Sequence, residues 1–438
     1  MRRLFVSIFL GSAVLAAGCG GSKGTSTSTG TTTGTTGSGA NSITLTVDGG
    51  PTATQPGGEL YANAAFATAT VCSPGSSSNC VTIDHLLVDT GSTGLRVFQS
   101  AVSSLNLPSL NASNGSPAYD CVSFVDGSYL WGAVQQADVT LGGEVATKTP
   151  IQVISGTTTG VPSSCSNGST DNQNTQASLG ANGILGVGVE QTDCFYRGGS
   201  VCDPSSGLST PPTPAYYACS TSTSCSPAFV SVANQVANPV ALFPSDNNGV
   251  IVKLPSVSGS AATLTGSLVF GIGTQSDNQL PSSPHLFTLT CDDFSTTFSG
   301  QNFAPDASTC GGAGSFIDSG SNGLYFPNVT KIPTCPSNTT VGNISGFYCP
   351  TATDNLSATM SGANGTSNSV SFSVANAEDL FTNTTTDSDA VLPTLGGPNP
   401  SGVGFDWGLP FFYGVNLYSA IDGETMPSGA PAAPWWAY

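Results

Sequence analysis

Two aspartates have the same neighbours in the two halves of the chain. The first lies in Val88-Asp89-Thr90-Gly91-Ser92-Thr93-Gly94-Leu95, and the second lies in Ile317-Asp318-Ser319-Gly320-Ser321-Asn322-Gly323-Leu324. Two carboxyls placed side by side cannot both ionise cheaply, so such a pair holds one proton over a wide acidic range. The ionised member can take a proton from a water, while the protonated member can donate one to a carbonyl oxygen. The repeat therefore predicts a catalytic acid–base pair, Asp89 and Asp318.

The residues directly after each aspartate suit this chemistry. They are Thr90, Gly91 and Ser92 in the first copy, and Ser319, Gly320 and Ser321 in the second. The glycines permit a sharp turn and a close backbone approach. The serines after the glycines can hydrogen-bond the outer carboxylate oxygens, and the hydroxyls directly after each aspartate can join the two halves. The alternative is that both aspartates only turn the chain in a Ser- and Gly-rich segment.

The elements that must position the aspartates are predicted to be short strands. Each aspartate ends an apolar run, as a buried strand running into a turn should. Residues 122–141 have the pattern of a β-hairpin, with Asp126-Gly127 at its tip. Other expected strands or short buried elements are Ile43–Val47, Tyr61–Val71, Val81–Val88, Ile184–Gly188, Ser267–Gly271, Leu286–Cys291 and a closing segment, Trp407–Ile421. A repeated motif on such elements predicts an all-β, two-lobed fold, with residues 43–250 and 251–438 as the lobes.

The composition supports a strand-and-turn protein. The chain has 438 residues, of which 38% are apolar and 8% charged, with 54 glycines and 29 prolines. Such a chain can bury a sizeable core in two domains. The formal net charge of −18 would repel a phosphate backbone, so we expect no nucleic-acid partner. Plain solubility and adaptation to acid both agree with this charge.

The N-terminus predicts export. Arg2 and Arg3 precede the apolar run Leu4–Ala17, which is too short for a stable membrane span and has the flanks of a signal peptide. The junction Leu15-Ala16-Ala17-Gly18-Cys19 resembles a bacterial lipobox. We therefore expect a signal peptide over residues 1–18 and lipidation of Cys19, with a Gly/Ser/Thr tether to residue 42. Gly20 favours the outer membrane of the bacterial envelope, and an ordinary signal peptide is the alternative.

The cysteines agree with an oxidising compartment. Of the 13 cysteines, 12 remain once Cys19 is set aside, an even number. Their spacing suggests the pairs Cys72/Cys80, Cys121/Cys165, Cys194/Cys202, Cys219/Cys225, Cys291/Cys310 and Cys335/Cys349, although spacing alone does not prove a connectivity. No pair has the CxxC spacing of zinc or redox sites, and the chain has two histidines. We expect no metal and no cofactor.

These motifs together resemble those of the bilobal, pepsin-like aspartic peptidases. The resemblance covers roughly residues 43–422, as short motifs in the family's order. Residues 89–92 and 318–321 are similar to the two catalytic triplets, and residues 122–128 lie where the family has its active-site flap. Residues 183–186, 268–271 and 408–422 are similar to its supporting elements. The chain also resembles an uncharacterised family of bacterial lipoproteins. The resemblance implies a cleft between two β-barrel-like lobes and hydrolysis of peptide bonds.

The chain departs from the peptidase pattern around the flap. Phe124 stands where the family usually has a tyrosine, and Tyr129 lies on the other arm of the hairpin. Arg96 replaces a tryptophan that often bonds that tyrosine, and either substrate contact or a salt bridge would account for it. Asp406 is an unexpected acid in the second lobe's Asp406-Trp407-Gly408 element. For Phe124 and Tyr129, hairpin packing is the alternative to a role in the flap.

Three functions agree with these observations. The first is an envelope-anchored aspartic endopeptidase, which we expect to be a monomer and to act on a peptide or protein. The second is a binding protein on a peptidase scaffold, which holds a peptide or wall fragment without cutting it. The third is a β-rich structural lipoprotein. The intact aspartates favour the first function, whereas the altered flap favours the second.

Overall fold

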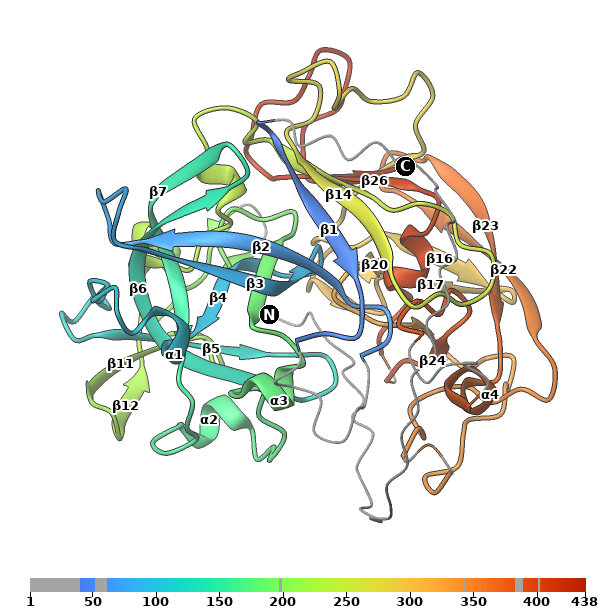
Figure 1. Cartoon of the computed structure of the whole chain (residues 1–438), viewed down its shortest axis with the longest axis horizontal. Helices are drawn as coiled ribbons and strands as arrows, with labels where there is room; N and C mark the ends of the chain where they lie inside the picture. The colour runs from blue at the N-terminus through green and yellow to red at the C-terminus, as the bar shows by residue number, and fades with distance from the viewer. Residues whose placement is uncertain are drawn as a thin grey trace, which may run out of the picture.

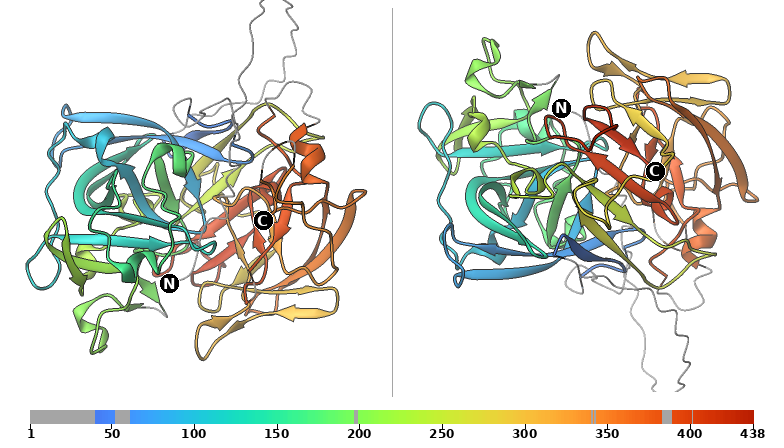
Figure 2. Two further views of the ribbon diagram at one scale, coloured as in Figure 1. Left: turned by 90° about the horizontal axis from the view of Figure 1, so that it is seen from below. Right: turned by 90° about the horizontal axis from the view of Figure 1, so that it is seen from above.

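The computed structural model describes residues 40–51, 61–196, 199–339, 341, 343–382, 389–400 and 402–438. The expected signal peptide, Cys19 and nearly all of the tether lie outside these residues. The chain forms two lobes, and the N-terminal and C-terminal halves lie side by side in all three views (Figures 1 and 2). In the described part, no helix is both long enough and apolar enough to cross a membrane.

The N-terminal lobe is built on a closed ring of six strands. The ring runs β2-β3-β8-β4-β7-β6 and closes where β6 pairs with β2. Its strands are β2 (Ala65–Cys72), β3 (Cys80–Asp89), β4 (Thr93–Phe98), β6 (Tyr129–Leu141), β7 (Glu144–Ile154) and β8 (Gly183–Val187). Alternating apolar residues, such as Leu86 and Val88, point into its core and are fully buried. A barrel without free edges thereby holds Asp89 at the end of β3.

A hairpin and a disulfide-linked insertion, which comprises residues 190–226, extend this lobe. β5 (Ala118–Ser123) pairs with β6, and β11 (Tyr216–Thr221) pairs with β5 and with β12 (Ser224–Pro227). Smaller elements are α1 (Gln99–Val102), α2 (Ser163–Ser166), α3 (Gln176–Leu179), β9 (Phe195–Tyr196), β10 (Gly199–Ser200), η2 (Pro204–Ser206), η3 (Val232–Asn234) and η4 (Val240–Leu242). Two of these short helices, α2 and α3, lie in the segment 156–182.

A continuous sheet joins the two lobes. β1 (Ser42–Val47) pairs with β2 on one side and with β14 (Leu264–Phe270) on the other. Beyond β14 the sheet continues through β13 (Gly249–Lys253), β26 (Asn416–Ala420), β27 (Trp435–Ala437) and β15 (Leu286–Thr288). The predicted lobe boundary at residue 250 falls inside β13. The aromatic C-terminal end forms a strand in which both tryptophans are fully buried.

The C-terminal lobe contains two further four-stranded sheets. One has the order β20-β25-β21-β24, with β20 (Phe316–Ile317), β21 (Leu324–Phe326), β24 (Gly396–Pro398) and β25 (Asp406–Trp407). The other has the order β17-β16-β22-β23, with β16 (Ser295–Phe298), β17 (Gln301–Phe303), β22 (Asp354–Ser361) and β23 (Ser367–Val374). The remaining elements are β18 (Pro305–Asp306), β19 (Gly311–Gly312), α4 (Ala377–Thr382) and η5 (Leu409–Phe412). The all-β, bilobal fold class predicted from the sequence is confirmed.

Disulfides fasten both lobes. The six pairs proposed from spacing are all present: Cys72–Cys80, Cys121–Cys165, Cys194–Cys202, Cys219–Cys225, Cys291–Cys310 and Cys335–Cys349. Five of them join cysteines that are at most 19 residues apart in the sequence, whereas Cys121 and Cys165 are 44 residues apart. That longest bridge ties β5 to α2. A cross-link stabilises mainly by restricting the unfolded chain, and it does so more when the loop is longer.

Candidate active site

The two lobes present their aspartates on the same arrangement of strands. In the N-terminal lobe, β8 lies between β3 and β4, parallel to β3 and antiparallel to β4, and β7 pairs parallel with β4. In the C-terminal lobe, β25 lies between β20 and β21 in the same directions, and β24 pairs parallel with β21. Each aspartate follows or ends the strand at one side of this group. The sequence repeat is therefore also a repeat in three dimensions.

Asp89 and Asp318 meet where the lobes join. Both side chains are fully buried, and a hydrogen bond connects their carboxyls. In the first lobe the Gly91 N–H donates to Asp89 Oδ1 at 2.9 Å, and the Ser92 hydroxyl bonds Oδ2. The second lobe repeats this pattern, with the Gly320 N–H 2.7 Å from Asp318 Oδ1 and Ser321 Oγ 2.9 Å from Oδ2.

The residues after the aspartates lock the lobes together. The Thr90 hydroxyl donates to the Ile317 carbonyl at 3.0 Å and accepts from the Ser319 N–H at 3.0 Å. The Ser319 hydroxyl reciprocates, donating to the Val88 carbonyl at 2.7 Å and accepting from the Thr90 N–H at 3.1 Å. All these groups are buried. Four reciprocal bonds thus fix the distance and angle between the two aspartates.

Burial and proximity set the protonation of the pair. Burial, the charge of Asp318 and their shared hydrogen bond raise the pKa of Asp89 well above its ordinary value. Burial also raises the pKa of Asp318, but the hydrogen bonds from Asp89, the Gly320 N–H and Ser321 oppose that rise. These effects make one proton shared across the pair the stable state in acid, with Asp89 the better holder of that proton.

A further side chain ties the lobes beside the second motif. Asn63 is fully buried, and its Nδ2 donates to the carbonyls of Asn322 and Leu392, both at 2.8 Å. Its Oδ1 accepts from the Leu392 N–H and from the Tyr413 hydroxyl, both at 2.7 Å. The segment before β2 is thereby fixed to the C-terminal lobe. Sequence reasoning missed Asn63, because a single asparagine among the apolar residues of the expected strand Tyr61–Val71 has no pattern that distinguishes it.

The predicted flap is a hairpin whose tip approaches the second lobe. Phe124 N–H donates to the Ser128 carbonyl at 2.9 Å, and Gly127 adopts a φ of +88° at the exposed tip. The charge of Asp126 contributes to a raised pKa of Tyr325, after burial and the charge of Asp406. Because Tyr325 follows the second motif on β21, the hairpin tip lies close to the second lobe's part of the site.

The flap's aromatic residues pack into the lobe. Phe124 is 5% exposed and belongs to a cluster with Phe66, Leu87 and Ile184. Tyr129 is 4% exposed and packs around the Cys121–Cys165 bridge. Both rings therefore pack within the N-terminal lobe, which is the alternative that the sequence left open beside a role in the flap.

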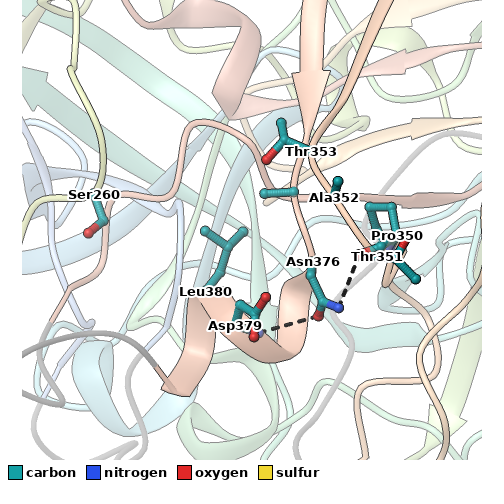
Figure 3. A pocket seen from close by; sticks show the side chains of 9 residues that line it. Ser260, Pro350, Thr351, Ala352, Thr353, Asn376, Asp379 and Leu380 are labelled. Atoms are coloured by element: carbon teal, nitrogen blue, oxygen red, sulfur yellow. Dashed lines mark hydrogen bonds between the residues drawn. The ribbon is translucent and has the colours of Figure 1, made fainter.

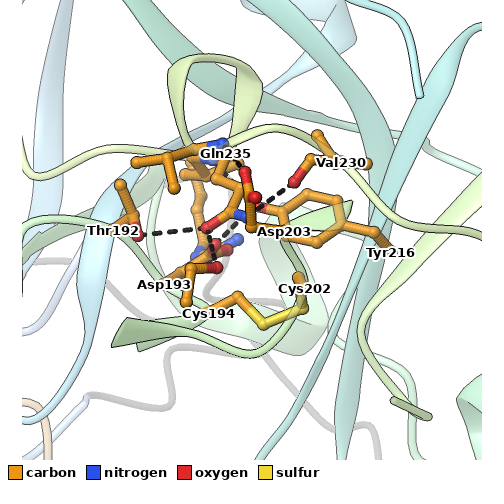
Figure 4. The surroundings of a disulfide bond; sticks show 12 residues. Thr192, Asp193, Cys194, Cys202, Asp203, Tyr216, Val230 and Gln235 are labelled. Atoms are coloured by element: carbon orange, nitrogen blue, oxygen red, sulfur yellow. Dashed lines mark hydrogen bonds and ion pairs between the residues drawn. A yellow bond between two sulfur atoms is a disulfide. The ribbon is translucent and has the colours of Figure 1, made fainter. Parts of the chain in front are cut away.

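The structure places the Arg96 side chain inside the N-terminal lobe. This side chain is 2% exposed, and its guanidinium bonds the carboxylate of Asp120, Asp193 Oδ2 at 2.9 Å and Gln152 Oε1 at 3.0 Å. The Tyr216 hydroxyl bonds Asp193 beside the Cys194–Cys202 bridge (Figure 4). Of the two roles that the sequence left open for Arg96, substrate contact or a salt bridge, the structure has the salt bridge, which the guanidinium forms with Asp120 and Asp193. It connects β4, directly behind the first motif, to the disulfide-linked insertion.

Replacing Arg96 with methionine is expected to destabilise the N-terminal lobe. Burial would lower the pKa of Arg96, but Asp120 and Asp193 raise it above its ordinary value, so the cation is retained. Without it the buried carboxyl of Asp120 and the partly buried carboxyl of Asp193 face each other, and breaking such a pair costs about 3–5 kcal/mol where it is buried. Thermal unfolding measures the loss of stability. Arg96→Lys keeps the charge but not the two-pronged guanidinium, so its melting temperature should lie between those of the wild type and Arg96→Met. An unchanged melting temperature in Arg96→Met would contradict this account.

Acid is expected to stabilise the fold. Burial raises the pKa values of Asp89, Asp120 and Asp406 well above the ordinary 3.8. Between the unfolded and folded pKa values, the folded chain binds more protons, so the free energy of unfolding falls as pH rises. Asp203 and Asp306 have lowered pKa values, but solvent screens these surface groups. Calorimetry should give a higher melting temperature near about pH 4 than near about pH 7, and Asp120→Asn should reduce that difference. A melting temperature that rises toward neutral pH would refute it.

A pocket of about 300 Å³ lies elsewhere in the C-terminal lobe. It is lined by Ser260, Pro350, Thr351, Ala352, Thr353, Ala375, Asn376, Asp379 and Leu380 (Figure 3). Asn376 donates to the Pro350 carbonyl at 3.2 Å and accepts from the Glu378 N–H at 2.9 Å, so its polar groups support the start of α4. No residue of the aspartate motifs lines this pocket. In the described part of the chain, no group of three or more His, Cys, Asp and Glu is arranged to hold a metal ion.

The fold and the site define a two-lobed β-protein with one aspartate of a buried pair on each lobe. The chain belongs to the family described as "Protein of unknown function (DUF3443)", whose model matches residues 37–438. Among solved structures it is similar to an aspartic proteinase from Irpex lacteus, with a TM-score of 0.43 and 15% identity over 90% of this chain and 96% of that one. No curated protein matches the sequence significantly.

Proposed function

We propose that the protein is an aspartic-type endopeptidase that uses Asp89 and Asp318 to activate water. The single observation that carries this proposal is the hydrogen bond between two fully buried carboxyls supplied by opposite lobes. A pair that has only a structural task would not need matching backbone and hydroxyl donors on both members. Such donors hold the carboxyls in one orientation, as acid–base catalysis requires.

The reaction balances with the protons that the pair can hold. The ionised aspartate takes one proton from water as the water oxygen bonds to the peptide carbonyl carbon. The protonated aspartate gives its proton to the carbonyl oxygen, and a gem-diol results. The C–N bond then breaks, the nitrogen receives the first aspartate's proton, and the second aspartate regains a proton from a gem-diol hydroxyl. The pair ends with one proton, as it began, and no covalent intermediate forms.

Cleavage of a denatured protein tests this function. The purified protein is incubated at about pH 4, where one proton remains on the pair, and the fragments are identified by mass spectrometry. Endoproteolysis that a pepstatin-like statine compound abolishes is the expected result. Affinity for the statine compound without cleavage selects the binding protein on a peptidase scaffold, which the packed positions of Phe124 and Tyr129 favour. Neither cleavage nor affinity removes both functions.

We also propose that the protein acts at the bacterial cell envelope, anchored through a lipid on Cys19 and facing a peptide or protein substrate. The support is the lipobox-like junction before Cys19 and the presence of six disulfides, which form in oxidising compartments. Mass spectrometry of the N-terminal peptide from membranes should find acylation on Cys19, and Cys19→Ala should release the protein from them. An unmodified cysteine would contradict the anchor.

A further inference from the structure

A third buried carboxyl lies behind the second aspartate. Asp406, on β25, is 4% exposed, and its Oδ2 lies 2.6 Å from Ser321 Oγ. The same hydroxyl lies 2.9 Å from Asp318 Oδ2. The ionisable groups that interact with Asp406 are Asp318, on the aspartate turn, and Tyr325, on β21, and Asp89 lies beyond Asp318. Within the described chain, none of the ion pairs involves these carboxyls.

The number of available protons decides the direction of the hydrogen bonds among Asp318, Ser321 and Asp406. Ser321 has one hydroxyl proton but stands between two carboxyl oxygens, so it can donate to only one of them. The other close contact therefore needs a proton on the carboxyl. Asp406 Oδ1 has no hydrogen-bond partner among the described residues, which makes an ionised Asp406 costly. Asp318, by contrast, accepts from the Gly320 N–H and from Asp89. The proton on Asp406 thus points to Ser321, and the Ser321 proton points to Asp318.

The other lobe provides an internal comparison. Asp406 pairs with Phe316 on β20 and with Tyr325 on β21. In the N-terminal lobe the same place on β8 belongs to Ile184, which pairs with Leu87 and Arg96. Ile184 is fully buried and apolar. The strand arrangement therefore accepts a hydrocarbon at this place. A buried acid at this position costs stability, and the fold does not require it. We therefore attribute the presence of Asp406 to its contact with the Ser321 hydroxyl.

We propose that Asp406 is a positioning residue of the aspartate pair, a neutral buried acid that holds the Ser321 hydroxyl toward Asp318 and so makes Asp318 the ionised member. This proposal rests on the proposed function and assigns the two roles within it. Asp318 takes the proton from water, and Asp89 donates to the substrate carbonyl. Burial and the charge of Asp318 raise the pKa of Asp406 well above its ordinary value, which agrees with a neutral acid.

The pH profile of kcat/KM for peptide cleavage tests this assignment. Asp406→Ile, which copies the residue of the other lobe, removes the donor to Ser321. Losing a hydrogen bond to the charged form raises the pKa of Asp318, so the acidic limb should move up by about one pH unit. Asp406→Asn keeps a neutral donor, and its acidic limb should stay in place. Ser321→Ala removes the hydroxyl that links Asp406 to Asp318. It should give the same shift of the acidic limb as Asp406→Ile.

The outcomes separate this proposal from the proposed function. A wild-type enzyme that cleaves, combined with an unmoved acidic limb in Ser321→Ala and in Asp406→Ile, overturns the role of Asp406 and leaves the peptidase intact. If Asp406→Ile does not fold, Ser321→Ala decides alone. If the wild-type protein does not cleave, carboxyl ¹³C titration decides: a raised pKa for Asp318 in these variants supports the proposal, and an unchanged one overturns it. Ile184→Val is the matched control on β8 and should leave the profile unchanged.

Discussion

Asp89→Asn and Asp318→Asn should each lower the rate of peptide hydrolysis by about 10³-fold or more at the optimal pH, because each removes one half of an acid–base pair. Asparagine has the same shape and can still accept from the Gly91 or Gly320 N–H through its amide oxygen. It cannot exchange a proton with water or with a carbonyl oxygen. Since Thr90 and Ser319 hold the lobes together independently of the carboxyls, the geometry should survive. The loss should therefore be chemical and appear in kcat.

Stability measurements distinguish this loss from misfolding. Burial raises the pKa of Asp89 well above its ordinary value, so a neutral amide removes a cost that the folded protein carries at neutral pH. Both variants should thus melt at the wild-type temperature or above it near about pH 7. Asp379→Asn, an isosteric change at an exposed position on α4, is the matched control and should retain full activity. Substantial cleavage by either dyad variant would show that hydrolysis does not depend on the pair.

Gly91→Ala should lower kcat by about 10²-fold, because a displacement of about 1 Å at a catalytic group has an effect of this size. A Cβ on Gly91 would lie 2.8 Å from Asp318 Cγ and 2.9 Å from its Oδ1. Neither distance is compatible with ordinary packing, so the Asp318 carboxyl or the turn must move. The Gly320 N–H at 2.7 Å and Ser321 restrict that movement. The variant therefore separates the two carboxyls while it leaves both of them present.

The steric cause can be isolated from backbone effects. Gly91 does not have a positive φ, so alanine suits its backbone and only the contact with Asp318 changes. Gly156→Ala is the matched control, because Gly156 also lacks a positive φ and nothing lies within 4 Å of an added Cβ. It should cleave as the wild type does. A fully active Gly91→Ala enzyme would mean that the two carboxyls need not be as close as the structure places them.

Local patterns were sufficient for the elements that build the site. The apolar run before each aspartate predicted strands, and the Asp126-Gly127 turn predicted the hairpin of β5 and β6. Both signals act between residues close in sequence, where backbone preferences and alternation decide the structure. The disulfides were predicted for the same reason, since most join cysteines fewer than 20 residues apart.

Side chains whose partners come from distant segments could not be assigned in this way. Arg96 directly follows the first motif, but its partners Asp120 and Asp193 lie on β5 and in the disulfide-linked insertion. Asp406 was noticed only as an unexpected acid, although the register of β25 places it beside Ser321. In the sequence, a charged residue that becomes buried looks the same as one that stays exposed. Its burial and its partners depend on which strands pair.

The sequence by itself determined the two aspartates, their supporting turns and the strand-rich lobes, and it suggested the cysteine pairs, because these features depend on residue types and mostly on short spacings. Only the tertiary structure decided that the carboxyls share a hydrogen bond, that Asn63 and the Thr90–Ser319 bonds fix the lobes, and that a third acid stands behind Asp318. These facts depend on the packing of segments that are 85 to 350 residues apart in the sequence. Hydrogen bonding at such separations is set by the pairing of whole strands, which no local pattern encodes.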